Sequence, residues 1–462
     1  MAVIQIDKDI CTGCQECSKV CPVYAIEGNP HEPQTIVTER CVMCGQCVQK
    51  CKSYVSLIDH GVAVYAQKRQ ERNLPDTVTE PLFAAYNVSH VDEVIKALQN
   101  PDTFTMVQAA PAVRVGIAED FGLPLGTLAA GKMAAALRRL GFNKVYDTNF
   151  TADLTIMEEG TELVKRVTEK GVLPMFTSCC PGWVKYMENN YPELTKHLSS
   201  CKSPQQMAGA VFKTYGAKLN GVDPAKVFTV SVMPCTCKAF ECDREEMKDS
   251  GYKDVDVVIT TRELAYMIKK MGIDFSALPN EPFDQPLGEY TGAATIFGVT
   301  GGVMEAAIRT GYTLITGKEL SDRDVDILPV RSTEGFRTAD IKAGDLTLKV
   351  GVLTNLKNID PIIEQLQNGT LDLHFVEVMT CPEGCVSGGG QPKLLVDADK
   401  PAAYENRRKA TFDHDKALPL RKSHANPAIT QIYKDFLEKP NGKLSHKLLH
   451  TKYKGGSASH HE

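Results

Sequence analysis

Sixteen cysteines determine most of the chemistry open to this chain of 462 residues. Thiolates are the side chains that hold iron–sulfur clusters and zinc in proteins. Eight of the cysteines lie close together, between Cys11 and Cys51. The other eight are dispersed and are Cys179, Cys180, Cys201, Cys235, Cys237, Cys242, Cys381 and Cys385. In a reducing compartment, cysteines in such numbers indicate metal binding or catalysis more than disulfides.

The first eight cysteines form two copies of the spacing C-x2-C-x2-C-x3-C. In such runs three thiolates hold one four-iron cubane, and the fourth cysteine ligates the other cluster. The spacing therefore predicts two ligand sets, which are Cys11, Cys14, Cys17 and Cys51, and Cys41, Cys44, Cys47 and Cys21. The alternative is zinc, which prefers two C-x2-C pairs that close one four-ligand site, and eight cysteines fit that poorly. The run resembles bacterial two-cluster ferredoxins.

The dispersed cysteines must be positioned by a larger fold. From about residue 104, short apolar segments alternate with helical ones, which predicts a parallel α/β architecture. The expected strands are 104–109, 171–178, 227–233, 256–259, 349–354 and 375–379, and the expected helices are 127–140, 183–190, 261–271 and 360–368. Sites in such sheets form beyond the carboxyl ends of strands. Cys179, Cys235 and Cys381 each follow an expected strand, so we expect them to converge on one metal centre.

Three segments carry these cysteines: Thr-Ser-Cys-Cys-Pro-Gly-Trp at 177–183, Met-Pro-Cys-Thr-Cys-Lys-Ala-Phe-Glu at 233–241, and Glu-Val-Met-Thr-Cys-Pro-Glu-Gly-Cys-Val-Ser-Gly-Gly-Gly-Gln at 377–391. They resemble the three signatures of iron-only (di-iron) hydrogenases. The resemblance extends to 110–114, 296–302 and 445–453, and so covers nearly the whole chain. It implies reversible conversion of two protons and two electrons into H2. It also implies an active cluster made of a cubane and a di-iron unit with carbonyl, cyanide and a dithiolate bridge.

The resemblance also implies ligands for that cluster. They are Cys180, Cys235, Cys381 and Cys385, with Cys385 expected to bridge to the di-iron unit. Cys179 resembles the proton-relay thiol of the family. Neighbouring side chains in extended backbone point in opposite directions, so two adjacent cysteines are not expected to ligate one cubane. One of the pair is therefore spare, and a spare thiol beside a metal is able to carry a proton.

A proton route to water is expected along one helix face. Glu159, Glu162 and Arg166 have the spacing i, i+3 and i+7, which brings them to the same side of a helix. Spacing alone favours a solvated charged face. The resemblance favours a relay through Cys179, Glu159, Ser199 and Glu162, with Arg166 at its outer end.

Further residues match positions around the di-iron unit in the family. The matching lysine is Lys238, which is implied to donate to a cyanide, with Glu241 one turn later to orient it; on spacing alone Lys238 would be a surface residue. A buried ammonium needs an anionic partner. The residues implied to pack around the unit are Pro111, Ala112, Gln205, Met233, Phe297 and Met379.

Some residues depart from the family pattern or stand outside it. The third segment has Glu383 and Thr380 where glycine and alanine are common, and Cys237 replaces serine or threonine. A separate metal site at Cys235, Cys237 and Cys242 is the weaker interpretation, because free cysteine is usually a small buried apolar residue. Cys201 is interpreted in the same way. His446 and His450 have the i, i+4 spacing of a metal pair, but no third ligand is near in sequence, so a structural role is favoured.

The expected fold is an α+β two-cluster ferredoxin-like domain followed by an α/β catalytic domain with two parallel-sheet lobes flanked by helices. The expected bounds are a ferredoxin-like domain at 1–75, a connector at 76–103, a catalytic domain at 104–424, a C-terminal helical extension at 425–455 and a flexible tail at 456–462. A net charge of -5 argues against a nucleic-acid surface. No apolar run is long enough for a bilayer, and no export signal is visible, so the cytoplasm is expected.

The resemblance implies partners as well. The electron carrier is expected to be a ferredoxin or flavodoxin, the substrates are H2 and protons, and maturation proteins insert the di-iron unit. Three relatives of the same fold are the alternatives. They are a non-catalytic iron–sulfur assembly or carrier protein, a hydrogen sensor, and a bifurcating subunit that works with a flavin partner. The presence of Cys179, Lys238 and a complete third segment disfavours the first of these.

Overall fold

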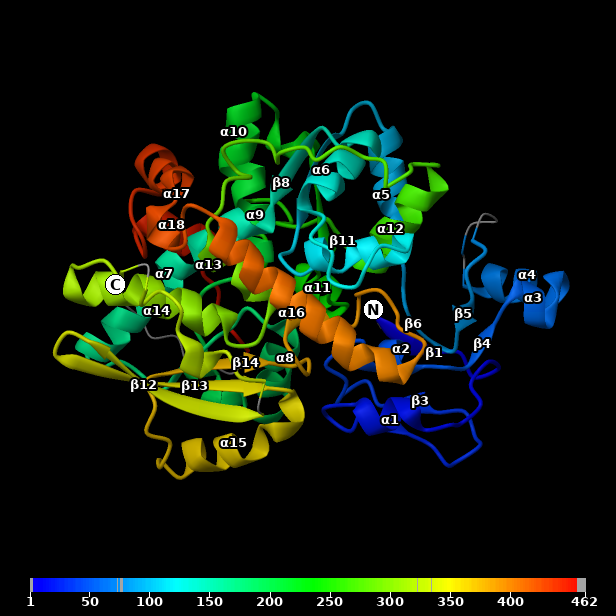
Figure 1. The fold of residues 1–462 in the computed structure, drawn as a ribbon, viewed down its shortest axis with the longest axis horizontal. Helices are drawn as coiled ribbons and strands as arrows, with labels where there is room; N and C mark the ends of the chain where they lie inside the picture. Colours follow the sequence, from blue (N-terminus) through cyan, green and yellow to red (C-terminus); the bar gives the residue numbers. More distant parts are fainter. Residues whose placement is uncertain (1–2, 73, 75–77, 322, 334, 455–462) are drawn as a thin grey trace.

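The computed structural model describes residues 3–72, 74, 78–321, 323–333 and 335–454. The tail predicted at 456–462 lies outside the described residues. Figure 1 shows the N-terminal segment, in blue, beside a larger body that contains two β-sheets, one above the other in this view. None of the helices within the described ranges is long and apolar enough to cross a membrane.

The N-terminal unit is built from two similar halves. Each half has a cysteine loop followed by a five-residue helix, α1 (Glu16–Val20) or α2 (Gln46–Lys50). The loops also match in backbone conformation, because Gly13 and Met43 have φ angles of 69° and 57°, and Gln15 and Gly45 have 58° and 75°. Left-handed residues of this kind occur in the backbone nests that bind anions and iron–sulfur clusters. Met43 and Gln15 adopt this conformation without being glycine, which a loop tolerates only where its surroundings enforce it.

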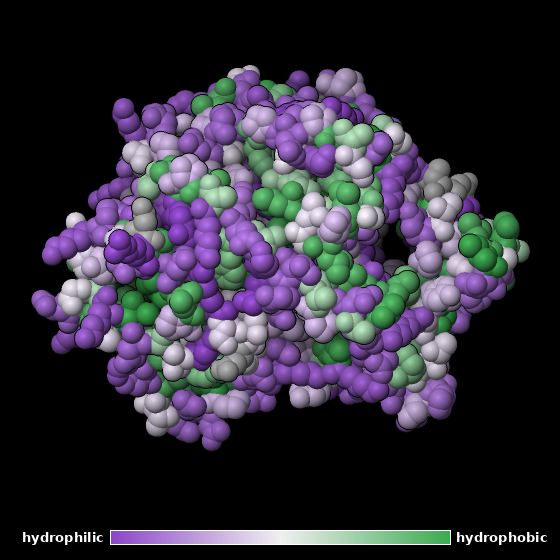
Figure 2. Space-filling view, in the orientation of Figure 1, coloured by the Kyte–Doolittle hydropathy of each residue, from purple (hydrophilic) through white to green (hydrophobic). Residues whose placement is uncertain are grey.

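The rest of this unit consists of short elements. They are β1 (Ile4–Ile6), β2 (Ile26–Glu27), β3 (Thr35–Ile36), β4 (Tyr54–Val55), α3 (Leu57–His60), α4 (Val62–Glu71), β5 (Leu82–Phe83) and β6 (Ala85–Asn87). β6 lies in the predicted connector and pairs antiparallel with β1. Figure 2 shows apolar side chains gathered over α3 and α4, where Ile58 and Val62 are 95% and 73% exposed. The helix α5 (Val91–Gln99) leads into the larger body.

The first sheet of the larger body is wholly parallel, with the strand order β11-β10-β7-β8. Its strands are β7 (Phe104–Ala109), β8 (Lys144–Asp147), β10 (Val227–Met233) and β11 (Val257–Thr260). Its helices include α6 (Ala130–Arg139), α9 (Pro204–Val211), α10 (Ala217–Asn220), α11 (Cys237–Cys242) and α12 (Thr261–Lys270). The helix α12 begins with a capping box, in which Thr260 and Glu263 satisfy each other's backbone N–H groups. Such a cap stabilises a helix end by about 1 kcal/mol.

The second sheet departs from the expected parallel arrangement. Its order is β12-β13-β14-β9, and β12 runs antiparallel to β13 while the other pairs are parallel. The strands are β9 (Met175–Phe176), β12 (Phe336–Ala343), β13 (Leu346–Thr354) and β14 (Phe375–Met379). A two-residue turn joins β12 to β13, and its first residue, Gly344, has a φ of 64° that favours glycine. The helices around this sheet include α8 (Pro181–Asn190), α13 (Gly292–Thr295), α14 (Gly302–Thr316) and α15 (Asp360–Gln367).

A long helix, α7 (Thr148–Thr168), connects the two lobes. Phe150 and Leu154 pack into the apolar core on the side of the first sheet. Ala152 and Ile156 pack with Val350 of the second sheet. The helix is therefore buried on most of its surface, and any polar side chain on its middle turns lies inside the protein.

The last three α-helices of the described residues are α16 (Lys400–Ala417), α17 (Pro427–Ile432) and α18 (Lys443–Leu449). In Figure 1, α16 runs diagonally across the front of the molecule, from the neighbourhood of α2 toward α13. Arg407 anchors it, because its buried guanidinium pairs with Glu119 and donates to the carbonyl of Val386 at 2.7 Å. This contact ties α16 to the segment that follows Cys385.

Candidate active site

Three strand ends bring the dispersed cysteines to one place. The strands β9, β10 and β14 end two or three residues before Cys179, Cys235 and Cys381, respectively. β9 and β14 are parallel neighbours, so their carboxyl ends lie at the same edge of the second sheet. The Thr380 hydroxyl lies 3.2 Å from the sulfur of Cys180, which joins the segments that follow these two strands. The expectation that sites form beyond strand ends is met by both sheets.

These segments line a single cavity between residues of the two sheets. The cavity has an empty volume of about 840 Å³, and this volume includes a part that is open to solvent. The lining contains all four cysteines that the resemblance implies as ligands, Cys180, Cys235, Cys381 and Cys385, together with Cys179 and Lys238. It also contains all six expected packing residues, which are Pro111, Ala112, Gln205, Met233, Phe297 and Met379. The structure therefore brings together expected site residues that are up to 274 positions apart, from Pro111 to Cys385.

The thiols in this cavity perturb one another. Burial raises the pKa of Cys235 to about 11 and that of Cys385 to about 12, and the neighbouring Cys180 raises both further. Burial also raises the pKa of Cys381 well above its usual value, with Cys235 the next cause. Four sulfurs gathered in apolar surroundings fit a multi-iron core, because the irons replace the thiol protons and neutralise the thiolates.

Two glycines allow the third segment to reach the cavity. A Cβ added at Gly388 would lie 2.2 Å from the carbonyl oxygen of Pro234, which is closer than any real contact. Gly384 has a φ of 82°, and a Cβ there would lie 2.7 Å from the backbone nitrogen of Thr300. The glycines between Cys381 and Gln391 thus serve close backbone packing, in keeping with the absence of a nucleotide-binding pattern there.

The N-terminal loops have the features of iron–sulfur sites. Backbone N–H groups donate to cysteine sulfurs in both, from Ala25 to Cys21 at 3.2 Å and from Ala85 to Cys51 at 3.3 Å. Hydrogen bonds of this kind to cluster sulfurs tune reduction potentials. Burial raises the pKa of Cys17 to about 11, and the further causes are Cys11, Cys51 and Cys14, the other members of its predicted ligand set. Burial raises the pKa of Cys47 well above its usual value, and Cys44, Cys41, Cys17 and Cys21 add to it.

The second N-terminal loop packs directly on the cavity. Cys44 is one of the lining residues. The hydroxyl of Thr236 donates to the carbonyl of Met43 at 2.7 Å, and the Gln49 amide donates to the carbonyl of Gln391 at 2.6 Å. The two cysteine-rich regions are therefore held in contact by buried hydrogen bonds. This arrangement suits electron transfer between a cluster at Cys44 and one in the cavity.

Lys238 is a buried cation with a fixed direction. Its Nζ donates to the carbonyl of Cys179 at 3.0 Å and to Oε2 of Glu241 at 2.9 Å. Oε2 of Glu241 also accepts from Ser203 at 2.8 Å and from Gln205 at 3.1 Å. Burial by itself would lower the pKa of Lys238, but the negative charge of Glu241 outweighs this effect and is the main reason that the pKa lies above its usual value. The lysine is thus charged inside the cavity wall, and it is not the surface residue that spacing alone favoured.

The expected proton route lies inside the protein at its first positions. Glu159 and Glu162 are only 1% and 9% exposed, which overturns the solvated face that spacing alone favoured. Burial raises the pKa of Glu159 to about 8, and Glu159 is the foremost charge acting on the Cys179 thiol. The Ser199 hydroxyl donates to Oε2 of Glu162 at 3.4 Å, and Arg166 pairs with Oε1 at 2.5 Å. Ser199, Glu162 and Arg166 are therefore in contact, and exposure increases along α7 from Glu159 to Arg166.

The departures from the family pattern are distributed around the cavity. Thr380 contacts the Cys180 sulfur, as described above. The half-buried Glu383 has one carboxylate oxygen without a hydrogen-bond partner, and burial raises its pKa. Cys237 is fully buried and lines the cavity. Cys242 donates to the carbonyl of Ala239 at 3.1 Å, so its neighbourhood is that of an ordinary helical thiol.

Sequence reasoning missed the residues that join the two cysteine-rich regions. Neither Thr236 nor Gln49 was expected to have a role, and nor was Cys44 expected to reach the cavity. One available signal is the difference between the two repeats. The first helix carries Glu16 and Lys19 where the second carries Gln46 and Gln49. Loss of charge at both positions indicates that the second repeat faces protein while the first faces solvent.

Comparisons with known proteins agree with this site. The family model described as iron only hydrogenase large subunit, C-terminal domain, matches residues 103–389. The model for iron hydrogenase small subunit matches 401–455, and a 4Fe-4S dicluster domain matches 3–52. The chain is 46% identical to the NADP-reducing hydrogenase subunit HndD of Solidesulfovibrio fructosivorans over 435 residues, 90% of this chain and 73% of the relative.

Three further matches extend the comparison. The chain is 46% identical over 393 residues to the periplasmic [Fe] hydrogenase large subunit of Nitratidesulfovibrio vulgaris, which covers 85% of this chain and 86% of the relative. The solved structure of a variant of apo [FeFe]-hydrogenase HydA1 from Chlamydomonas reinhardtii matches with a TM-score of 0.70 and 41% identity. That match covers 80% of this chain and all of the other. Cytosolic Fe-S cluster assembly factor narfl of Danio rerio is more distant, at 28% identity over 358 residues, 75% of this chain and 85% of the relative.

Proposed function

This chain belongs to the iron-only hydrogenase family, and we propose how its own residues contribute to the family's reaction, the reversible conversion of two protons and two electrons into H2. The cofactors are two 4Fe-4S clusters and an active cluster, a cubane joined to a di-iron unit with carbonyl, cyanide and dithiolate ligands. When bound, the active cluster supplies the redox chemistry and the cleavage of H2. The protein supplies ligands, orientation, a dry cavity and the transfer of protons and electrons.

The proposed ligands of the active cluster are Cys180, Cys235, Cys381 and Cys385, with Cys385 as the bridge to the di-iron unit. Their support is the shared cavity and the mutual perturbation of their buried thiols. Pro111, Ala112, Gln205, Met233, Phe297 and Met379 are proposed to enclose the di-iron unit and exclude water. Exclusion of water strengthens each polar contact in such a site.

The proposed ligands of the N-terminal clusters are the two crossed sets. Cys11, Cys14, Cys17 and Cys51 are proposed to hold the outer cluster, and Cys21, Cys41, Cys44 and Cys47 the inner one. The N–H···S bonds and the contact of Cys44 with the cavity support this assignment. Electrons are proposed to pass from the outer cluster to the inner one and then to the cavity.

The proton route is proposed to run from Cys179 through Glu159, Ser199 and Glu162 to Arg166. The observation that carries it is the burial of two carboxyl groups in sequence on α7, since a buried carboxyl with a raised pKa is able to accept and release a proton near neutral pH. Lys238 is proposed to hold a cyanide ligand of the cluster through the third hydrogen of its ammonium group. Glu241 is proposed to position Lys238.

The electron carrier is proposed to be a ferredoxin or flavodoxin that docks on the N-terminal unit. The exposed apolar side chains of α3 and α4, Ile58 and Val62, support a protein contact beside the outer cluster. H2 and protons are the substrates, and maturation proteins insert the di-iron unit. The cytoplasm is proposed as the compartment, because it keeps sixteen cysteines reduced; fractionation of the native cells tests this.

The substitution Cys179→Ala tests the proton route. The variant is expected to keep about fourteen irons, four in each cubane and two in the di-iron unit, and its infrared bands from carbonyl and cyanide. Its turnover is expected to fall by about 10²-fold or more, the usual contribution of a positioned proton donor. Cys242→Ala is the matched control, because Cys242 is a buried thiol outside the cavity lining. Full turnover in Cys179→Ala would refute the relay, and about eight irons in both variants would leave only the N-terminal module.

A further inference from the structure

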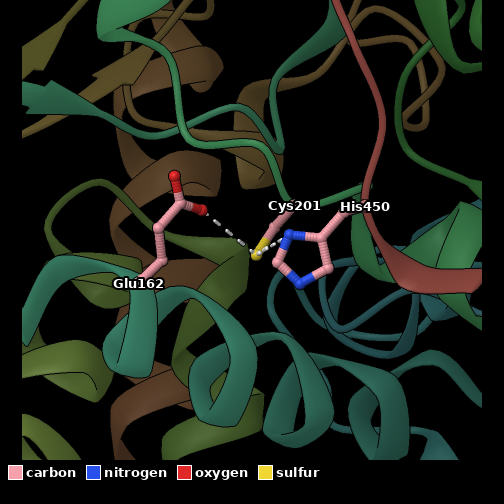
Figure 3. A group of neighbouring side chains, drawn as sticks. All are labelled: Glu162, Cys201 and His450. Carbon is pink, nitrogen blue, oxygen red and sulfur yellow. Dashed lines mark hydrogen bonds between the residues drawn. The ribbon is translucent and has the colours of Figure 1, made fainter. Parts of the chain in front are cut away.

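Three side chains of different types meet at the outer part of the proposed proton route. They are Glu162 from α7, Cys201 from the segment before α9, and His450 at the end of α18. The sulfur of Cys201 lies 3.9 Å from Oε2 of Glu162 and 4.0 Å from Nδ1 of His450. Figure 3 shows the sulfur between the carboxylate and the imidazole ring. The three potential ligand atoms all lie within 4.8 Å of one another.

A buried carboxylate, that of Glu158, fixes the orientation of the His450 imidazole. Nε2 of His450 lies 3.1 Å from Oε2 of Glu158, and both side chains are at most 2% exposed. Glu158 is itself fixed, because it accepts from the Tyr433 hydroxyl and from the backbone N–H of Asn441 at 2.7 Å. The carboxylate favours a proton on Nε2, which leaves a lone pair on Nδ1, the nitrogen that lies 2.7 Å from the Ser200 hydroxyl and 4.0 Å from the Cys201 sulfur. A carboxylate behind a histidine is the arrangement that supports histidine ligands in metal sites.

Hydrogen-bond donors reach the carboxylate of this group from two neighbours, because the Ser199 hydroxyl lies 3.4 Å and the Ser200 N–H 3.1 Å from Oε2 of Glu162. The Ser200 hydroxyl lies 2.9 Å from Oε2 of Glu162 and 2.7 Å from Nδ1 of His450, but its one hydrogen serves only one of them. Cys201 is 0% exposed, and among the described residues its sulfur is hydrogen-bonded only through the two long contacts given above. A thiol, an imidazole and a carboxylate thus face a common point.

The surroundings are negative. Burial raises the pKa of Cys201 well above its usual value, and the charges that raise it further are those of Glu162, Glu159 and Glu158. Arg166 offsets part of this charge, through Oε1 of Glu162 and not through the oxygen that faces the sulfur. A cation placed among the three ligand atoms would therefore be stabilised.

We propose that Glu162, Cys201 and His450 form a binding site for a thiophilic divalent cation of the Zn²⁺ class. Sulfur, imidazole nitrogen and carboxylate oxygen are the three ligand types that zinc takes, and Ser200 or water supplies a fourth position. Binding moves the Cys201 thiol proton to solvent, so affinity rises with pH. A second cluster of carboxylates, Glu305 with Asp326 and Asp415, is already neutralised by arginines such as Arg309.

The consequence rests on the proposed function. A cation on Oε2 of Glu162 occupies the oxygen that accepts from Ser199 and Ser200. If protons pass through Glu162, the occupied carboxylate no longer exchanges them, and zinc inhibits turnover without displacing iron. The site thus gives the family's reaction a point of control by free zinc.

Binding and inhibition are tested separately on the mature holoenzyme. Zinc X-ray absorption reports the ligands, with one sulfur at about 2.3 Å and nitrogen or oxygen at about 2.0 Å expected. Turnover is then measured with increasing zinc, each variant is compared with its own zinc-free rate, and iron content is measured before and after. Addition of a chelator is expected to restore the rate.

Variants locate the site. Cys201→Ala and His450→Gln are expected to remove the sulfur signal or weaken zinc binding at least tenfold, and Glu158→Gln is expected to weaken it by about 10–100-fold, as for other residues behind a ligand. His446→Gln is the matched control, since His446 stacks on His450 at 4.5 Å but is exposed and contributes no ligand atom. Zinc without a sulfur ligand in the parent, or equal affinity in Cys201→Ala, would overturn the site. Sulfur-ligated zinc without inhibition would keep the site and count against the proton route.

Discussion

The hydroxyl of Thr236 donates a hydrogen bond to the carbonyl oxygen of Met43 across 2.7 Å, and both groups are buried. Thr236 follows Cys235, a proposed ligand of the active cluster, and Met43 precedes Cys44, a proposed ligand of the inner N-terminal cluster. The bond therefore joins the two cysteine loops directly. We expect this close contact between the loops to set the rate at which electrons reach the cavity.

Substitution of Gly389 tests this contact. A Cβ there would lie 2.2 Å from the carbonyl oxygen of Cys44 and 2.6 Å from the Cα of Gly45, and backbone cannot move aside as a flexible side chain does. Gly389→Ala is expected to keep all clusters but to lower H2 production from reduced ferredoxin several-fold. Magnetic coupling between clusters, measured by electron paramagnetic resonance, is expected to weaken as well.

Gly311→Ala is the control for this experiment. Gly311 lies in α14, and an added Cβ there meets nothing within 4 Å. Alanine is favoured over glycine in a helix by about 1 kcal/mol, so this variant is expected to be as active as the parent and slightly more stable. Equal electron transfer in both variants would mean that the loop contact does not limit the rate.

The carboxyl of Glu159 makes stability depend on pH. Its pKa is 4.5 ordinarily and about 8 in the folded chain, because burial disfavours the charged form. Between these two values the folded state holds a proton that the unfolded state has released, so stability falls as the pH rises. Glu159→Gln removes this dependence. Its melting temperature relative to the parent is therefore expected to rise from about pH 4.5 to about pH 8 and then to level off, as measured by calorimetry at a series of pH values. A constant difference would show that Glu159 titrates normally.

Arg114 and Asp147 form a buried ion pair. The guanidinium nitrogen lies 2.6 Å from the carboxylate oxygen, and the two side chains are 1% and 0% exposed. Removal of one partner leaves a buried charge, which costs about 3–5 kcal/mol. Arg114→Met is therefore expected to lower the thermal unfolding midpoint markedly. The double variant Arg114→Met with Asp147→Asn is expected to recover part of the loss.

The matched surface pair is Arg40 with Glu27, whose side chains are 41% and 64% exposed. Arg40→Met is expected to change stability by less than about 1 kcal/mol. If the two arginine variants unfold at the same temperature, burial does not determine the contribution of the Arg114 pair.

Lys238 is expected to retain the di-iron unit. Lys238→Met removes the buried ammonium that Glu241 holds at 2.9 Å, so an anionic ligand in the cavity loses its partner. Iron content is expected to fall from about fourteen to about twelve per chain, which leaves three cubanes, and the infrared bands of carbonyl and cyanide are expected to weaken. Glu241→Gln is the graded comparison, because it keeps the cation but loosens its direction. Unchanged infrared bands in Lys238→Met would exclude this role.

Much of the site was predictable because it depends on local patterns. The strands 104–109, 227–233 and 375–379 were predicted with the bounds that they have, since runs of buried β-branched residues identify parallel strands. The cysteines that follow strands were predicted to converge, and they line one cavity. By contrast, β12 was missed because Arg337, Asp340 and Lys342 make it look like a loop. The helix α16 was missed because it buries charged residues such as Arg407.

Other features depend on pairs that are distant in sequence. His450 was expected to lack a third ligand, because none is near it along the chain. The structure brings Cys201 and Glu162 to it from 249 and 288 positions away. Likewise the Gln49 amide meets Gln391 only after the whole chain has folded. No local pattern carries such information, since spacing identifies neighbours on one element but not across two.

The residues that line the cavity run from Cys44 to Gly388. A ribosome that has translated only the first half of the message has therefore produced neither Cys381 nor Cys385. The active cluster is therefore able to bind only after most of the polypeptide, up to Cys385, has been synthesised. Both crossed cysteine sets of the N-terminal unit, in contrast, are complete once Cys51 has emerged, so that iron delivery to them is possible while synthesis is still under way.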